Sequence, residues 1–176
     1  PPRSSEIFHL VVIPVAKESP SVVEANVLSV ARNEAFARQT VIVLAVEARA
    51  ERSVREGIVR IAKDSRDRFM EFLVVEHPDG LHGEARVKGA NTSYAAKTAA
   101  KYFETNRIPF ENVIVSCFDA DTVVGPDYFA CLTYCFMNCP DRHRASFQPI
   151  PVFHNNIWEV PGFARVIETG SSFFQL

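Results

Sequence analysis

The run Ile7-Phe8-His9-Leu10-Val11-Val12-Ile13-Pro14-Val15 consists almost entirely of apolar residues. A strand buried on both faces of a parallel sheet needs such a continuous run, whereas a half-exposed strand alternates apolar and polar residues. We therefore predict a central strand over residues 7–15. Pro14 is expected to end it, because proline has no N–H to donate to a sheet ladder.

Outward from this run, strand-like and helix-like stretches alternate along the chain. Apolar spacing, caps and turn residues predict a helix over 21–38 with a Ser21–Glu24 capping box, a strand over 40–46, a helix over 50–68, a strand over 72–75, a helix over 91–104 capped by Asn91-Thr92-Ser93, a strand over 112–118 and a helix from Pro126 to near Cys139. This alternation predicts an α/β fold, with a mostly parallel, Rossmann-like sheet flanked by helices.

Length and composition limit the classes of protein that need considering. The 176 residues fit one globular domain, with 47% hydrophobic and 23% charged residues. A net charge of −2 argues against a dedicated nucleic-acid-binding protein. No apolar stretch is long enough to cross a bilayer, which favours a cytoplasmic protein. The chain begins at Pro1 and stops at an apolar Phe-Phe-Gln-Leu end, so we expect it to be part of a longer protein.

The four cysteines do not predict a metal centre. Cys131, Cys135 and Cys139 recur every four residues, a spacing that lacks the paired Cys-x-x-Cys elements of zinc sites. We expect them to be small buried residues on the core-facing side of a helix, and Cys117 to be buried in its strand.

Phe118-Asp119-Ala120-Asp121 follows the strand predicted over 112–118 and carries the most specific chemical signal. Two carboxylates one residue apart, without a neighbouring His or Cys, suit Mg²⁺ or Mn²⁺ better than zinc. In a parallel sheet the carboxyl ends of the strands share one edge, where ligands bind. That rule gathers residues 14–18, Glu47, the segment 77–91 and the acidic pair into one candidate nucleotide or phosphate site.

These segments, in this order, resemble family 2 glycosyltransferases over roughly residues 7–135. The resemblance lies in Val12-Ile13-Pro14-Val15-Ala16-Lys17-Glu18, in Glu47, in Lys88-Gly89-Ala90-Asn91, and in Asp119-Ala120-Asp121-Thr122 followed by Pro126-Asp127-Tyr128. It implies a GT-A-like domain over 1–176, with a nucleotide-binding half (1–140) and the start of an acceptor half (141–176). The implied activity transfers a sugar from a nucleotide-sugar, commonly a UDP-sugar, to a glycan or lipid acceptor, as in polysaccharide biosynthesis.

The resemblance also implies a role for each matching residue. Asp121, helped by Asp119, would hold Mn²⁺ or Mg²⁺, and Asp119 would also face the donor. The remaining donor-binding residues would be Pro14, Val15, Ala16, Glu18, Glu47, Lys88 and Asn91. A longer protein of this kind would lie on the cytoplasmic face of a membrane or be embedded in it.

The chain departs from the family pattern at three points. Lys17 stands where an Asn is common, and Glu47 is a single acid where many members have a pair. No residue is placed as the catalytic base: Glu159 and Glu168 are candidates by chemistry alone, and the base is expected beyond Leu176.

Two other functions stay open. In a haloacid-dehalogenase-like phosphatase, Asp119 would be the nucleophile and Asp121 the acid/base. The third possibility is a non-catalytic nucleotide-binding or interaction domain.

Overall fold

The computed structural model describes residues 2–78 and 88–149, with Lys88 described by its backbone alone. The chain forms two compact units, Pro1–His143 and Arg144–Leu176. All of the helices and strands given below belong to the first unit. The division into nucleotide-binding and acceptor halves stays a prediction.

The first unit is built on a four-stranded sheet in which every neighbouring pair of strands is parallel. Its strands are β1 (Phe8–Val15), β2 (Thr40–Glu47), β3 (Glu71–His77) and β4 (Val113–Cys117), in the order β3-β2-β1-β4. This sheet, with helices on both faces, confirms the predicted α/β, Rossmann-like class.

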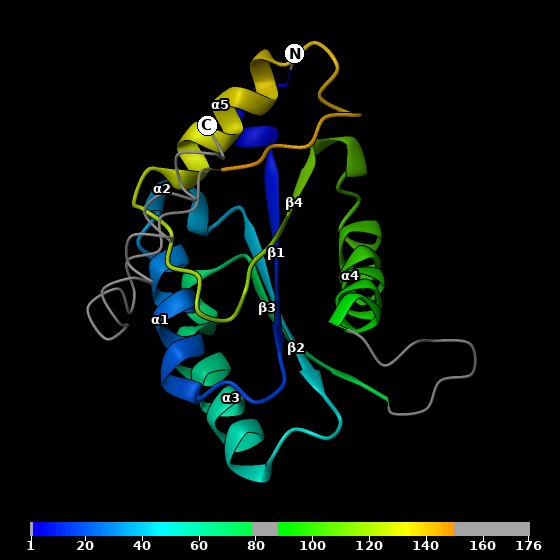
Figure 1. Ribbon diagram of the computed structural model, residues 1–176. Helices are drawn as coiled ribbons and strands as arrows, with labels where there is room; N and C mark the ends of the chain where they lie inside the picture. The colour runs from blue at the N-terminus through cyan, green and yellow to red at the C-terminus, as the bar shows by residue number, and fades with distance from the viewer. Residues whose placement is uncertain (1, 79–87, 150–176) are drawn as a thin grey trace, which may run out of the picture. The chain divides into compact units, whose positions relative to one another are not determined.

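Helices cover both faces of the sheet. They are α1 (Pro20–Ala31), α2 (Glu34–Ala37), α3 (Arg52–Ser65), α4 (Lys88–Thr105) and α5 (Tyr128–Asn138), with short 3₁₀ turns at Ser4–Glu6, Arg66–Arg68 and Phe110–Asn112. Figure 1 shows α1, α3 and α5 on one side of the sheet and α4 on the other.

Strand β1 contributes to the hydrophobic core on each side of the sheet. Val11, Ile13 and Val15 pack in the core beneath α1 and α3, whereas Leu10 and Val12 pack in the core beneath α4. Each such fully buried side chain stabilises the fold by about 1.5–3 kcal/mol. The two-sided burial inferred from the continuous apolar run is therefore confirmed.

Pro14 does not end β1, contrary to the prediction. It is buried within the strand and lies opposite Ala45 of β2. Val12 O accepts the Phe118 N–H on the β4 side, and positions two apart in a strand face the same neighbour. The Pro14 nitrogen therefore faces β4, whose ladder with β1 has already ended at Val12 and Cys117. The missing N–H costs no ladder hydrogen bond there.

Two helices also differ from the prediction in where they begin or end. The first helix begins at Pro20 after Ser19, without the predicted Ser21–Glu24 capping box, and ends at Ala31 before the separate turn of α2. Helix α4 begins at Lys88, so Asn91 lies inside its first turns instead of capping it. Asn33, just after α1, and Asn91, in α4, each donate a hydrogen bond to a segment far along the chain. Local sequence patterns do not show such contacts.

None of the four cysteines is fully buried, so the prediction of buried cysteines is wrong. Cys117, Cys131 and Cys135 are exposed, and Cys139 is half-buried. The buried residues of α5 are Phe129, Thr133 and Phe136, so its core face is offset from the cysteine row.

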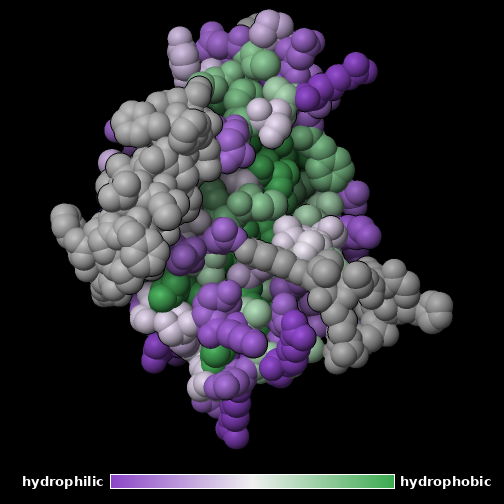
Figure 2. Space-filling view, in the orientation of Figure 1, coloured by the Kyte–Doolittle hydropathy of each residue, from purple (hydrophilic) through white to green (hydrophobic). Residues whose placement is uncertain are grey.

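Strand β4 is less covered than the two central strands, β1 and β2. Val115 is 55% exposed, and hydrophobic residues gather in Figure 2 over the region where Figure 1 shows β4. Among the described residues, no strand pairs with the outer edge of β4. Its alternation of buried and exposed residues shows that one face of β4 is left uncovered at this edge of the sheet, which the apolar run alone did not predict.

His9 is a buried polar residue near the start of β1. Its Nε2 shares a 3.0 Å hydrogen bond with Thr133 Oγ1 of α5, and its ring lies between Phe36 and Phe129. Burial lowers the pKa of His9 to about 4, because a charged imidazole would lose its hydration.

This burial predicts a pH dependence of stability. Between the ordinary histidine pKa of about 6.5 and the folded-state value, the unfolded chain binds a proton that the folded chain does not. The free energy of unfolding should therefore fall as the pH drops from about 6.5 to 4, by up to about 3 kcal/mol from this residue. His9→Gln keeps an amide near Thr133 but does not titrate, so it should flatten this part of the profile. Urea denaturation from pH 7.5 to 4 measures both proteins, and parallel profiles would contradict the assignment.

Gly57 allows α3 to pass close to the start of α1. A Cβ atom at this position would lie 2.4 Å from Cγ and 2.6 Å from Cβ of Pro20, whose ring cannot swing away. Gly57→Ala should therefore lower the free energy of unfolding by about 1–3 kcal/mol through overpacking. In the control Gly89→Ala, the new Cβ meets nothing within 4 Å, and this substitution in the first turn of α4 should change stability by less than about 0.5 kcal/mol. Equal effects in chemical denaturation would refute the steric argument.

Candidate functional site

The carboxyl edge of the sheet brings together most of the predicted site segments. Val15 pairs with Val46, so Ala16 follows β1 beside Glu47 at the end of β2. Phe118 donates to Val12, which places Asp119 next to the last residues of β1 on its other side. The chain passes from β1 through β2 to β3 and then returns to place β4 beside β1. The strand order thus reverses between β1 and β4, the position where open α/β sheets bind ligands.

Asp119 and Asp121 are both exposed, while Ala120 between them is only 4% exposed. The Thr122 N–H donates to Asp119 O at 2.9 Å, which closes a tight turn around the pair. Two exposed carboxylates on such a turn offer hard oxygen ligands that fit Mg²⁺ or Mn²⁺. Within residues 2–78 and 88–149, no three His, Cys, Asp or Glu side chains form a ready-made metal cage. Mg²⁺ sites often use one or two carboxylates and take further oxygens from substrate phosphates, which is compatible with this pair.

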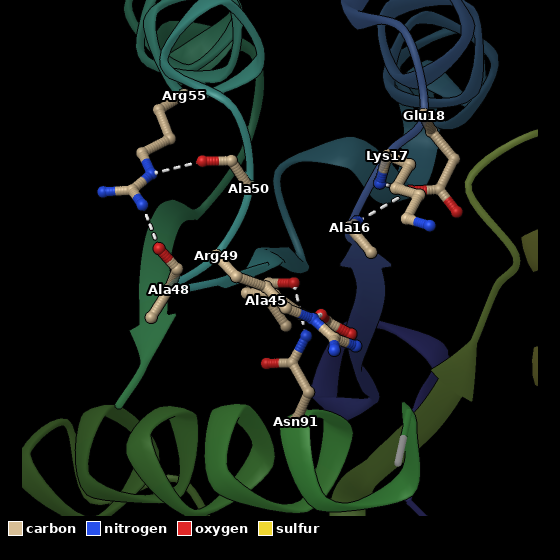
Figure 3. Close-up of polar contacts among 10 residues, drawn as sticks. Ala16, Lys17, Glu18, Ala45, Ala48, Arg49, Ala50, Arg55 and Asn91 are labelled. Carbon is tan, nitrogen blue, oxygen red and sulfur yellow. Dashed lines mark hydrogen bonds and ion pairs between the residues drawn. The ribbon is translucent and has the colours of Figure 1, made fainter. Parts of the chain in front are cut away.

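Glu18 shapes the loop that follows β1. Its Oε2 accepts the N–H of Ala16 at 2.7 Å and the N–H of Lys17 at 3.0 Å (Figure 3). Each of these charge-assisted hydrogen bonds is stronger than a neutral one. The carboxylate predicted to bind the donor therefore also fixes the backbone of its own loop.

Glu47 is part of an ion pair at the end of β2. Its Oε2 lies 2.5 Å from Arg49 Nε, and the Glu47 side chain is 19% exposed. The following residues are held by Arg55, which donates to the carbonyls of Ala48 and Ala50 (Figure 3). Arg49 and Arg55 were not predicted as site residues, because arginines in a charged helix-start segment usually indicate a solvated surface.

Asn91 connects α4 to the sheet. Its Nδ2 donates to Ala45 O of β2 at 2.8 Å, and its buried Oδ1 has no hydrogen-bond partner among the described residues. Asn91 and Glu47 thus come together near the end of β2, as expected, although the amide of Asn91 also has a structural role.

The other predicted donor residues are placed differently. The side chains of Pro14 and Val15 are buried in β1, below the exposed edge. The side chain of Lys88 lies outside the described residues, as do Glu159 and Glu168. The predicted contacts of these residues with a donor stay predictions.

Three further polar residues that the sequence did not point to lie behind the acidic pair. Asn26, Ser29 and Asn33 are buried and form hydrogen bonds with the segment 119–129. The available signal was their spacing: two amides and a hydroxyl at i, i+3 and i+7 interrupt an otherwise apolar helix face.

Comparison with known proteins identifies no family for this chain. No protein-family model matches the chain, and no curated protein matches it. Of the helices that the structure describes, none combines the length and the apolar character needed to span a bilayer.

The contact of Asn91 with the sheet can be tested as a stability determinant. Asn91 is only 3% exposed, and Asn91→Ala would remove its buried hydrogen bond to Ala45 O, a carbonyl that keeps its place in the β1–β2 ladder. The free energy of unfolding should fall by about 0.5–1.5 kcal/mol. The matched control is Asn106→Ala, which removes an exposed amide that donates to Tyr102 O at 2.8 Å and should change stability by less than about 0.5 kcal/mol. Similar values for the two variants in urea denaturation would show that the Asn91 bond is not important.

Proposed function

We propose that this chain is the nucleotide-sugar-binding part of a metal-dependent glycosyltransferase, with a UDP-sugar as donor and a glycan or lipid as acceptor. The observation that carries the proposal is the position of Asp119 and Asp121. Two exposed carboxylates share a tight turn at the carboxyl end of β4, where the strand order reverses. The ordered resemblance to family 2 glycosyltransferases supports the same function.

Different residues at this edge would bind different parts of the donor. Asp119 and Asp121 would hold Mn²⁺ or Mg²⁺, and Ala16, Glu47 and Asn91 would lie on the side of the nucleotide. In such a site a divalent ion neutralises the charge of the leaving diphosphate. Glu18 would act by holding the backbone of Ala16 and Lys17 in place.

Calorimetric titration tests this proposal directly. The chain should bind UDP and UDP-sugars in the presence of Mn²⁺, and the affinity should fall at least about 10-fold in Asp121→Ala, since one of two protein ligands is lost. Asp119→Ala should weaken binding as well. The control is Asp127→Asn, because Asp127 is an exposed carboxylate on the same segment but precedes α5.

Three results would redirect the assignment. Absence of metal-dependent nucleotide binding by the wild-type chain would overturn the proposal. Turnover of p-nitrophenyl phosphate that is lost in Asp119→Asn would instead support a phosphatase. If the chain showed neither nucleotide binding nor phosphatase activity, the non-catalytic interaction domain would be favoured.

A further inference from the structure

Three polar side chains from one region of the chain are all directed at the segment that carries the acidic pair. Asn26 and Ser29 lie on the buried face of α1, and Asn33 follows α1 directly. All three are buried, at 0%, 0% and 3% exposure in chain order. We call them the α1 clasp. Figure 1 shows the connection between β4 and α5 running beside α1.

The clasp contacts the segment 119–129 at three successive points. Asn26 Nδ2 donates to Asp119 O at 2.8 Å and lies 3.4 Å from Ala120 O. Ser29 Oγ accepts the Val124 N–H at 3.1 Å. Asn33 Nδ2 donates to Gly125 O at 3.1 Å, and its Oδ1 accepts the Phe129 N–H at 3.4 Å. The order of the contacts along the segment follows the order of the clasp residues along the chain.

At these buried positions the three polar side chains would lower the stability of the fold if they formed no hydrogen bonds. Asparagine and serine have low helix propensity, and burial of an amide or hydroxyl costs free energy without a hydrogen bond. An apolar residue at either α1 position would fit the surrounding Val23, Val27 and Val30. Each clasp side chain forms a hydrogen bond with the same segment, whose backbone has few ladder partners of its own.

We propose that Asn26 is a positioning residue for the Asp119–Asp121 pair, supported by Ser29 and Asn33. Asn26 holds the two carbonyls on either side of the Ala120 Cα atom, and Ala120 is turned into the core beside Phe118. With Ala120 held inward, the neighbouring carboxylates both face outward. A site built from two carboxylates needs such a fixed backbone, because small misplacements weaken it. This inference rests on the proposed metal-binding role of the pair.

Asn26→Leu tests the role, because leucine keeps the volume and removes the amide. Mn²⁺ binding by the 176-residue chain, with and without UDP, should weaken about 10-fold. The electron paramagnetic resonance spectrum of bound Mn²⁺ should change, and the amide hydrogens of Thr122 and Val124 should exchange faster. Ser29→Ala is a smaller change that removes the Val124 contact, and it should show the same effects to a lesser degree.

Thr133→Val is the matched control. It removes a buried hydrogen bond, to His9, at the opposite end of the sheet. It should lower stability and leave the Mn²⁺ affinity, the spectrum and the exchange of Val124 unchanged. A purely structural role of Asn26 would make the two variants alike.

The outcomes separate this inference from the proposed function. Wild-type chain that binds no Mn²⁺ would overturn the proposed function, and the positioning role with it. Wild-type binding that is matched by Asn26→Leu and Ser29→Ala would overturn the positioning role alone. Equal weakening in Thr133→Val would also overturn it, since general destabilisation would then explain the loss.

Discussion

The structure depends on the two-sided pairing of β1 and on the one position where that pairing has to stop. Val12 O still accepts the Phe118 N–H, but Pro14, the next residue that faces β4, has no N–H to donate. Pairing with β2 is unaffected and continues through Val15. The segment after Phe118 therefore leaves the sheet while its neighbour is still a strand, and the acidic pair lies at that divergence.

A segment that leaves a ladder needs other partners for its buried backbone groups. The α1 clasp supplies several of them from side chains, at a cost in helix propensity. Because Asn26 and Ser29 occupy the core face of α1, the packing of that helix against the sheet and the shape of the acidic segment are coupled. A change in the packing of α1 would therefore shift the backbone that carries Asp119 and Asp121.

The sequence predicted the strands better than their surroundings. Residues 7–15 and 40–46 were located within one residue, because two-sided burial leaves a long apolar run. The convergence of Glu47 and the acidic pair on one edge followed from parallel topology alone. The end of α1, the early start of α4 and the exposed cysteines depend on partners far along the chain. A local pattern contains no information about such partners, so Asn33 and Asn91 were misread as ordinary helix residues or caps.

The acids of the carboxyl edge lie in different backbone settings. Glu18 accepts two backbone N–H groups in the loop after β1, and Glu47 pairs with Arg49. Asp119 and Asp121 project from an exposed turn whose backbone is held from behind by Asn26. Two neighbouring carboxylates repel an anionic diphosphate, and a bound dication offsets their charge and offers the diphosphate a positive centre. Lys17, after β1, and Arg49, after β2, add positive charge at the same edge. Under the proposed function, a bound metal ion would strengthen the attraction of this edge for a diphosphate.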